Sequence, residues 1–193
     1  MTGAGQAGLS VREVLAYLVG MFDGEGCLTI NIEKDLRKRF ISETGGWRII
    51  PCVQFTNSDN GIVRHIAQLL ATLRYHPSIQ RYGNGSTHVR LFRMEEVKRF
   101  CTEARRYSCG EKAKQLAIFV DRLIPIFDAR PYVGTDALRR SWTKELFLRA
   151  IDSVDEINQH KRTRRSARKY TREYFDELWG MLADDPTKAR FNH

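Results

Sequence analysis

The segment 10–33, where a helix pattern turns directly into a strand pattern, constrains the fold more than any other part of the sequence. It opens with Ser10-Val11-Arg12-Glu13, a capping box in which each side chain satisfies a backbone N–H group of the other residue. Apolar residues then recur at the helical period, at Val11, Val14, Leu15, Leu18, Met21 and Phe22. We expect this helix to end near Asp23, because Gly24 and Gly26 break it.

A strictly alternating segment, Cys27–Glu33, follows at once and predicts a half-buried strand. A second strand is expected at about 48–56, after Gly45-Gly46, although Pro51 lacks a donor for the ladder. A helix from Ser58 or Asp59 to about Arg74 comes next. The remaining expected elements are a hairpin of strands 78–82 and 87–93, helices 95–106 and 111–127, a loop 128–141, and helices 142–159 and 171–182.

This order predicts an α+β fold with a four-stranded antiparallel sheet that helices cover on one face. With 193 residues and 42% hydrophobic residues, the chain can bury a sizeable core. We expect one domain over residues 1–193, with a core at about 10–127 and a helical, basic C-terminal region at 128–193.

The charge balance points to a polyanionic partner. The formal net charge is +9, which suits nucleic acid or an anionic membrane surface, and composition alone does not separate the two. No window approaches the roughly 18 apolar residues that cross a bilayer, and residues 1–8 do not resemble a signal peptide. The four cysteines form no CxxC pair, so we expect a reduced, intracellular protein without zinc, located in cytoplasm, nucleoid or an organelle.

The stretch Leu18-Val19-Gly20-Met21-Phe22-Asp23-Gly24-Glu25-Gly26 resembles the LAGLIDADG motif of homing endonucleases. Leu18, Gly20, Asp23 and Gly26 stand where the motif has Leu, Gly, Asp and Gly. Gly24-Glu25 replaces Ala-Asp, and Val19 replaces the small Ala. The expected order of helices and strands is similar to that of the family, so the resemblance implies the αββαββα core with a DNA-binding sheet and, here, extra C-terminal helices.

The resemblance implies a homodimer, because family members with one motif pair two copies and the second half of this chain holds no other motif. Gly20 lacks a Cβ, so a second helix could approach it closely. The expected dimer contacts are Tyr17, Leu18, Gly20, Met21 and Asp23. Two such helices would bring two Glu25 carboxylates together, a repulsion that divalent cations relieve, with Mg²⁺ favoured and Ca²⁺ or Mn²⁺ as substitutes.

The family roles transfer to four positions. Glu25 matches the metal-binding acid, and the Gly24 carbonyl matches a secondary metal contact. Asn57 matches a polar residue that orders solvent, although the family often has Gln there. Lys112 matches a lysine near the scissile phosphate that could activate water or stabilise transition-state charge. The alternatives are ordinary ones: a solvated acidic turn for Glu25, a turn residue for Asn57 and a solvated lysine for Lys112.

Side chains on the outward face of the sheet are the candidate base contacts. If Ile79, Val89 and Leu91 face the core, the outward residues are Thr29, Asn31, Glu33, Arg48, Ile50, Cys52, Gln54, Gln80, Tyr82, His88 and Arg90. The alternative is the polar solvent face that any such sheet has. The stretch 161–172 carries seven basic residues, among them Lys161, Arg164 and Arg165, which we expect to contact phosphates, unless the run is simply solvated or a localisation signal.

Together these features predict a site-specific, Mg²⁺-dependent endonuclease that cuts double-stranded DNA at a long pseudo-palindromic site, with no membrane and no small-molecule substrate. Intron encoding is part of this expectation. One alternative is a non-cleaving protein of the same fold, either an intron maturase or a DNA-binding regulator. Another is an RNA-binding domain that meets ribosomal RNA, but this leaves Asp23-Gly24-Glu25-Gly26 unexplained.

Overall fold

The computed structural model describes residues 9–35, 43–83, 85–131, 141–161 and 169–184. The chain divides into two compact units, which are described separately below. Unit 1 comprises Met1–Thr29 and Pro51–Leu116, and unit 2 comprises Ile30–Ile50 and Ala117–His193.

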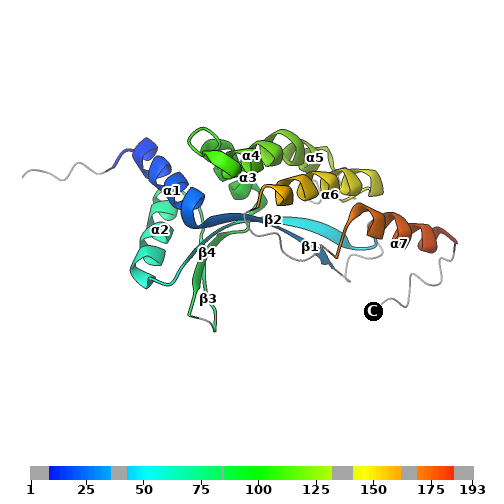
Figure 1. Cartoon of the computed structure of the whole chain (residues 1–193), viewed down its shortest axis with the longest axis horizontal. Coiled ribbons are helices and arrows are strands. Elements are labelled where there is room, and N and C mark those ends of the chain that lie inside the picture. The colour runs from blue at the N-terminus through cyan, green and yellow to red at the C-terminus, as the bar shows by residue number, and fades with distance from the viewer. Residues whose placement is uncertain (1–8, 36–42, 84, 132–140, 162–168, 185–193) are drawn as a thin grey trace, which may run out of the picture. The chain divides into compact units, whose positions relative to one another are not determined.

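The predicted α+β class and the antiparallel four-stranded sheet are confirmed, and the strand order is β1-β2-β4-β3 (Figure 1). The elements in chain order are α1 Val11–Glu25, β1 Gly26–Lys34, β2 Trp47–Asn57, α2 Asn60–Thr72, β3 Ser78–Arg81, β4 Thr87–Leu91, α3 Met94–Ala104, α4 Gly110–Ile118, a π-helical turn η2 Phe119–Leu123, α5 Ile124–Ala129, α6 Lys144–Gln159 and α7 Arg172–Asp184. Every predicted helix and strand is present, most of them with ends within two residues of the prediction.

Helix α1 begins at the predicted capping box. The backbone N–H of Ser10 donates to Glu13 Oε2 (2.8 Å), and the Glu13 N–H donates to Ser10 Oγ (3.3 Å). The apolar stripe buries Val14, Leu15, Leu18, Val19 and Phe22. The helix continues to Glu25, two residues beyond the predicted end, because Gly24 is accommodated in the last turn and only Gly26 leaves the helical conformation (φ −85°, ψ 166°).

The core of unit 1 is built on a triad of aromatic rings. Phe22 of α1, Phe55 of β2 and Phe100 of α3 meet edge to face, with ring centroids 5.6–6.1 Å apart. All three side chains are at most 1% exposed. Edge-to-face rings add roughly 0.5–1.5 kcal/mol per pair beyond their area burial, so this triad holds the C-terminal half of α1 against the sheet and α3.

The β3–β4 hairpin corrects one sequence prediction. Val89 and Leu91 are fully buried, as expected, but Ile79 is 49% exposed. Ile79 pairs with Val89, so its register is the predicted one. β3 is the edge strand, and all four of its residues are exposed.

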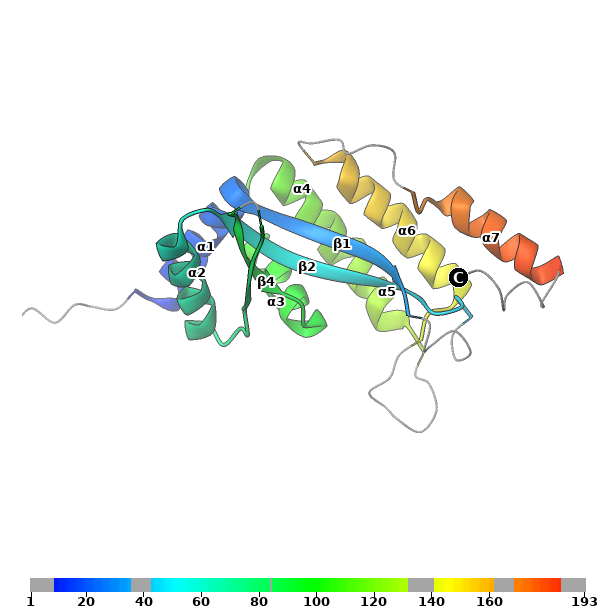
Figure 2. The same ribbon diagram turned by 90° about the horizontal axis from the view of Figure 1, so that it is seen from below.

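Unit 2 gathers its helices around a second aromatic cluster. Trp47 of β2 meets Phe175 of α7 (centroids 5.2 Å apart), and Phe175 meets Phe147 of α6 (4.9 Å). Helices α6 and α7 are in contact and lie side by side in Figure 2. The predicted helix 111–127 is observed with a π turn before Pro125. Proline has no backbone N–H to donate, and its ring clashes with the preceding helical turn.

We predict that Gly26→Ala destabilises the protein. A Cβ at Gly26 would lie 2.5–2.6 Å from the ring, Cα and carbonyl oxygen of Phe22, and the two backbone atoms cannot move aside cheaply. The expected loss in the free energy of unfolding is about 1–3 kcal/mol, measured by urea denaturation. The matched control is Gly180→Ala in α7, where a Cβ meets nothing within 4 Å and stability is expected to rise by about 0.5–1 kcal/mol. A Gly26→Ala protein as stable as the native one would contradict this packing.

Candidate active site and nucleic-acid interface

Glu25 occupies the last position of α1 and is exposed. Among the described residues, nothing hydrogen-bonds to its carboxylate or pairs with it. The preceding Gly24 is also exposed, and a Cβ there would meet open space. Carbonyl groups in the last helical turn lack intrahelical donors. The end of α1 therefore offers a carboxylate and a neighbouring carbonyl oxygen on open backbone.

Asp23 ties this helix end to α4. Its carboxylate accepts hydrogen bonds from Ser108 Oγ (2.5 Å) and from the backbone N–H of Cys109 (3.0 Å). Cys109 immediately precedes α4. The sequence predicted Asp23 as a dimer contact, but its carboxylate is engaged within the chain. The sequence did not predict Ser108 and Cys109 as partners of Asp23. The only pattern that could have indicated them is Ser108 and Gly110 at the start of a predicted helix.

Lys112 contacts the last residue of the motif, whereas its expected place near a scissile phosphate stays a prediction. From the first turn of α4 its ammonium donates to the carbonyl oxygen of Gly26 and lies 5.1 Å from the centre of the Phe22 ring. Burial of the side chain lowers the pKa of Lys112, against the opposing attraction of Cys27 and Asp23. The structure thus places a cation next to the residue that follows Glu25.

Asn57 acts in a turn. Its Oδ1 accepts from the backbone N–H of Asp59 (2.8 Å), and Asp59 in turn caps α2 through the N–H groups of Gly61 and Ile62. This is the ordinary role that the sequence left open. The amide NH₂ of Asn57 has no partner among the described residues, so it can still orient solvent.

The face of α1 that unit 1 leaves open contains part of the predicted dimer contact. Tyr17 is 43% exposed and stacks edge to face with His65 of α2. A Cβ at Gly20 would meet nothing within 4 Å, and Met21 is half-buried. Leu18 is fully buried in the core, so its prediction as a surface contact is wrong: it lies on the opposite side of the helix from Gly20.

The outward face of the sheet in unit 1 carries a hydrogen-bonded network centred on Arg90. The guanidinium donates to Gln54 Oε1 (2.8 Å), Gln80 Oε1 (2.9 Å), the Tyr82 hydroxyl and His88 Nδ1 (3.2 Å). All five of these residues were predicted to face outward. Register explains the grouping, since Gln54 and Ser78 flank Arg90 across the strands while Thr56 and Gln80 flank His88.

Other outward positions behave differently. Cys52 is 3% exposed, so its prediction as a surface residue is wrong. Burial raises the pKa of its thiol to about 11, against the lowering effect of the Arg90 charge. The Thr29 hydroxyl is half-buried and donates to Cys27 Sγ (3.5 Å).

In unit 2, Asn31 is exposed and Ile50 is half-buried. Arg48 pairs with Glu33 (3.4 Å) and with the buried Asp35 (3.5 Å). Two of the predicted base contacts, Glu33 and Arg48, therefore compensate each other's charge in the free protein. Lys161, at the start of the basic stretch, is half-buried, whereas Arg164 and Arg165 lie outside the described residues.

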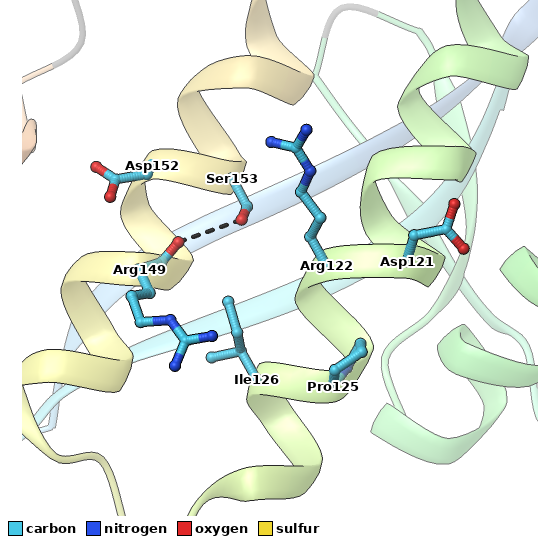
Figure 3. A pocket seen from close by; sticks show the side chains of 7 residues that line it. All are labelled: Asp121, Arg122, Pro125, Ile126, Arg149, Asp152 and Ser153. Carbon is cyan, nitrogen blue, oxygen red and sulfur yellow. Dashed lines mark hydrogen bonds between the residues drawn. The ribbon is translucent and has the colours of Figure 1, made fainter.

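A cleft in unit 2 between α6 and the consecutive elements η2 and α5 contains none of the predicted site residues (Figure 3). It is lined by Asp121, Arg122, Pro125, Ile126, Arg149, Asp152 and Ser153. Its charges have partners, since Arg122 pairs with Glu156 and Asp152 with Arg172 (2.5 Å). We assign it no role in the chemistry.

Within the described parts of the chain, no group of three or more His, Cys, Asp or Glu side chains could hold a metal ion. No helix in the described ranges is long and apolar enough to cross a membrane.

Residues 12–104, just under half of the chain, match the LAGLIDADG-like domain family. No curated protein sequence matches the chain. Solved structures resemble it strongly in fold at low sequence identity. The homing endonuclease I-CvuI in complex with a DNA target has a TM-score of 0.67 at 13% identity, over 90% of this chain and 96% of that chain.

Two further structures extend the comparison. The archaeal intron-encoded homing endonuclease I-Vdi141I, complexed with DNA, has a TM-score of 0.63 at 13% identity, over 88% of this chain and 96% of that chain. I-SmaMI bound to uncleaved DNA has a TM-score of 0.59 at 16% identity, over 88% of this chain but only 48% of that chain.

The order αββαββα of the first seven elements and these structural matches give the chain the homing endonuclease fold. The chain therefore resembles LAGLIDADG proteins: residues 12–104 match that family, and the fold of the described residues is that of the homing endonucleases compared above.

We predict that Asp23→Asn lowers the pKa of the Cys109 thiol toward its ordinary value. The hydrogen bond to Asp23 and the charge of Asp23 together raise this pKa in the native chain. The measurement is the pH dependence of iodoacetamide alkylation at Cys109, resolved by mass spectrometry, whose midpoint is expected to shift to lower pH. Asp176→Asn, at an exposed position in α7, is the control and should leave it unchanged. An unshifted midpoint in Asp23→Asn would show that the tie to α4 is absent in solution.

Proposed function

We propose that this chain is a site-specific double-strand DNA endonuclease of the homing type, intracellular and encoded within a mobile intron, which acts as a homodimer. The observation that carries the proposal is the end of α1, where an unpaired Glu25 carboxylate stands on open backbone and Lys112 is fixed one residue further on. Continuity of β1 and β2 through both units supports treating residues 1–193 as one functional domain.

The residues present fit a divalent cation. The Glu25 carboxylate and the Gly24 carbonyl are hard oxygen donors, the kind that Mg²⁺ and Ca²⁺ prefer, with Mn²⁺ also suited. I-CvuI was solved with DNA in the presence of Mg in one case and Ca in another. When bound, such an ion polarises the phosphate and makes an attacking water more acidic.

The chain's own groups do the rest. Lys112 brings a positive charge to the end of the motif, where it can stabilise negative charge that develops on the phosphate. Its burial lowers the pKa, so the same group releases a proton more readily than a solvated lysine would. The Asn57 amide NH₂ can orient a water near the phosphate. In-line attack of water then cuts one phosphodiester on each strand.

The share of each relative that the chain matches and the open face of α1 support the proposal of a homodimer. The chain covers 96% of I-CvuI but 48% of I-SmaMI, as expected if it corresponds to one half of the larger protein. A glycine inside a helix costs roughly 1 kcal/mol relative to alanine, and no contact among the described residues explains Gly20. Close approach of a second α1 would explain it and would bring two Glu25 carboxylates to the two-fold axis.

We predict that Glu25→Gln abolishes cleavage and preserves DNA binding, because the amide keeps the shape but loses the charge that holds the cation. The substrate is duplex DNA carrying the uninterrupted insertion site, with Mg²⁺ for cleavage and Ca²⁺ for binding. The control is Glu95→Gln in α3, whose carboxylate is 83% exposed and pairs with Lys98. Binding without cleavage by the native chain would instead favour a maturase or DNA-binding regulator of the same fold.

We further predict that Gly20→Ala weakens self-association while stabilising the isolated subunit. The new methyl group improves helix propensity but would be overpacked against a second helix, at a cost of about 1–3 kcal/mol, or roughly tenfold or more in the dimer dissociation constant. Sedimentation equilibrium measures the constant. Gly180→Ala makes the same change on another open helix face and should not alter it. Equal association of both variants would exclude α1 as the interface.

A further inference from the structure

Arg90 determines which atoms donate and which accept in the hydrogen-bonded network on the outward face of the sheet. A guanidinium has five N–H donors and no acceptor. Nε donates to Gln54, Nη1 to Gln80, and Nη2 to both Tyr82 and His88. Four of the five donors are therefore used, and too few remain for the two-donor contact by which arginine usually recognises guanine.

Because Arg90 can only donate, the atoms that face it must be acceptors. The amide oxygens of Gln54 and Gln80 therefore point inward, and the orientation of both amides is determined. The Tyr82 hydroxyl accepts from Arg90 and donates to Gln80 Oε1 (3.1 Å). The Gln80 oxygen therefore accepts two hydrogen bonds, one from Arg90 and one from Tyr82. The remaining Nε2 group of Gln80 has no partner among the described residues, and Gln80 is exposed.

His88 follows the same direction. Its Nδ1 accepts from Arg90, so the proton of the neutral ring lies on Nε2, 3.3 Å from Ser86 Oγ. Burial, and then the charge of Arg90, lower the pKa of His88 and favour this neutral ring. The ring also stacks on Tyr82 at a centroid distance of 4.2 Å, which holds both side chains in place. The five residues thus form one pre-organised unit.

We infer that Arg90 is a positioning residue, and that Gln80 reads DNA with its amide NH₂ alone and so selects guanine over adenine. A glutamine pairs with adenine through its oxygen and its NH₂ together. With the oxygen held by Arg90 and Tyr82, only donors reach the groove. Guanine presents two acceptors, N7 and O6, whereas adenine presents one acceptor next to a donor. This inference rests on the proposed function and specifies which base this part of the sheet reads.

The experiment selects bound duplexes from a pool of randomised double-stranded DNA, with Ca²⁺ present and cleavage suppressed. The position read by Gln80 is the one whose base preference weakens in Gln80→Ala. There the native chain is expected to prefer guanine over adenine by about tenfold, within the range for a good two-bond contact. Arg90→Leu removes one of the two donors on the amide oxygen and also the guanidinium that holds the Tyr82 hydroxyl in place, so this oxygen can accept from a base and the preference should shift toward adenine.

Gln80→Glu removes the NH₂ donor of residue 80 but keeps an oxygen that accepts the hydrogen bond from Arg90. Loss of the guanine preference in Gln80→Glu is expected. Arg81→Leu is the matched control, because it removes one positive charge from the exposed strand β3. The cross-strand partner of Arg81 is the buried Thr87, so Arg81 does not pair with an outward residue of β4. It should weaken binding overall without changing the selected base.

Adenine at the Gln80 position in the native chain, or an unchanged selection in Arg90→Leu and Gln80→Glu, would overturn the inference while leaving DNA binding intact. Failure of the native chain to retain any duplex would overturn the proposed function, and this inference with it.

Discussion

The close contact between Gly26 and Phe22 is the constraint on which the site depends. At Gly26 the chain leaves α1 in close contact with the preceding helical turn. A Cβ there would lie 2.6 Å from the Cα and the carbonyl oxygen of Phe22, so only glycine fits. The chain then enters β1 directly, and the Gly26 carbonyl turns toward Lys112. Asp23 fixes α4 from the other side through Ser108 and Cys109. Glu25 lies in the sequence between Asp23 and Gly26, which make these contacts. Its backbone position is therefore fixed, whereas its side chain is exposed.

Helix α1 must satisfy two different requirements with one sequence. Its buried stripe ends at Phe22, in an aromatic triad with Phe55 and Phe100 that fixes its rotation. That rotation leaves Tyr17 and Gly20 on the open side. The core of unit 1 therefore decides which face is offered to a second helix, and the same rotation sets where Glu25 stands relative to that face.

Much of this could be predicted from the sequence, because local patterns determine it. The capping box, the helical stripe and the alternating strand predicted α1 and β1, and the family resemblance pointed to Glu25 and Lys112 as candidates, whose roles stay predictions. Predictions based on alternation alone failed where tertiary surroundings decide exposure. Ile79 is exposed because β3 is an edge strand, and Cys52 is covered although its register is outward. Leu18 belongs to the core, as the helical stripe predicts, and not to the exposed face on which the family resemblance placed it. The ties from Asp23 and the Arg90 network join residues up to 86 positions apart, and no short-range pattern encodes such contacts.

Disulfide trapping at Gly20 tests most directly the claim that two α1 helices meet across a two-fold axis. In a chain with Cys27→Ser and Cys109→Ser, the two remaining native cysteines, Cys52 and Cys101, are buried. A Gly20→Cys substitution there should form a covalent dimer on mild oxidation, because a disulfide needs Cα atoms within about 7 Å. Gly180→Cys in the same background should stay monomeric. If Gly20→Cys crosslinks no faster than Gly180→Cys, the two helices do not meet, and the paired site at Glu25 does not exist.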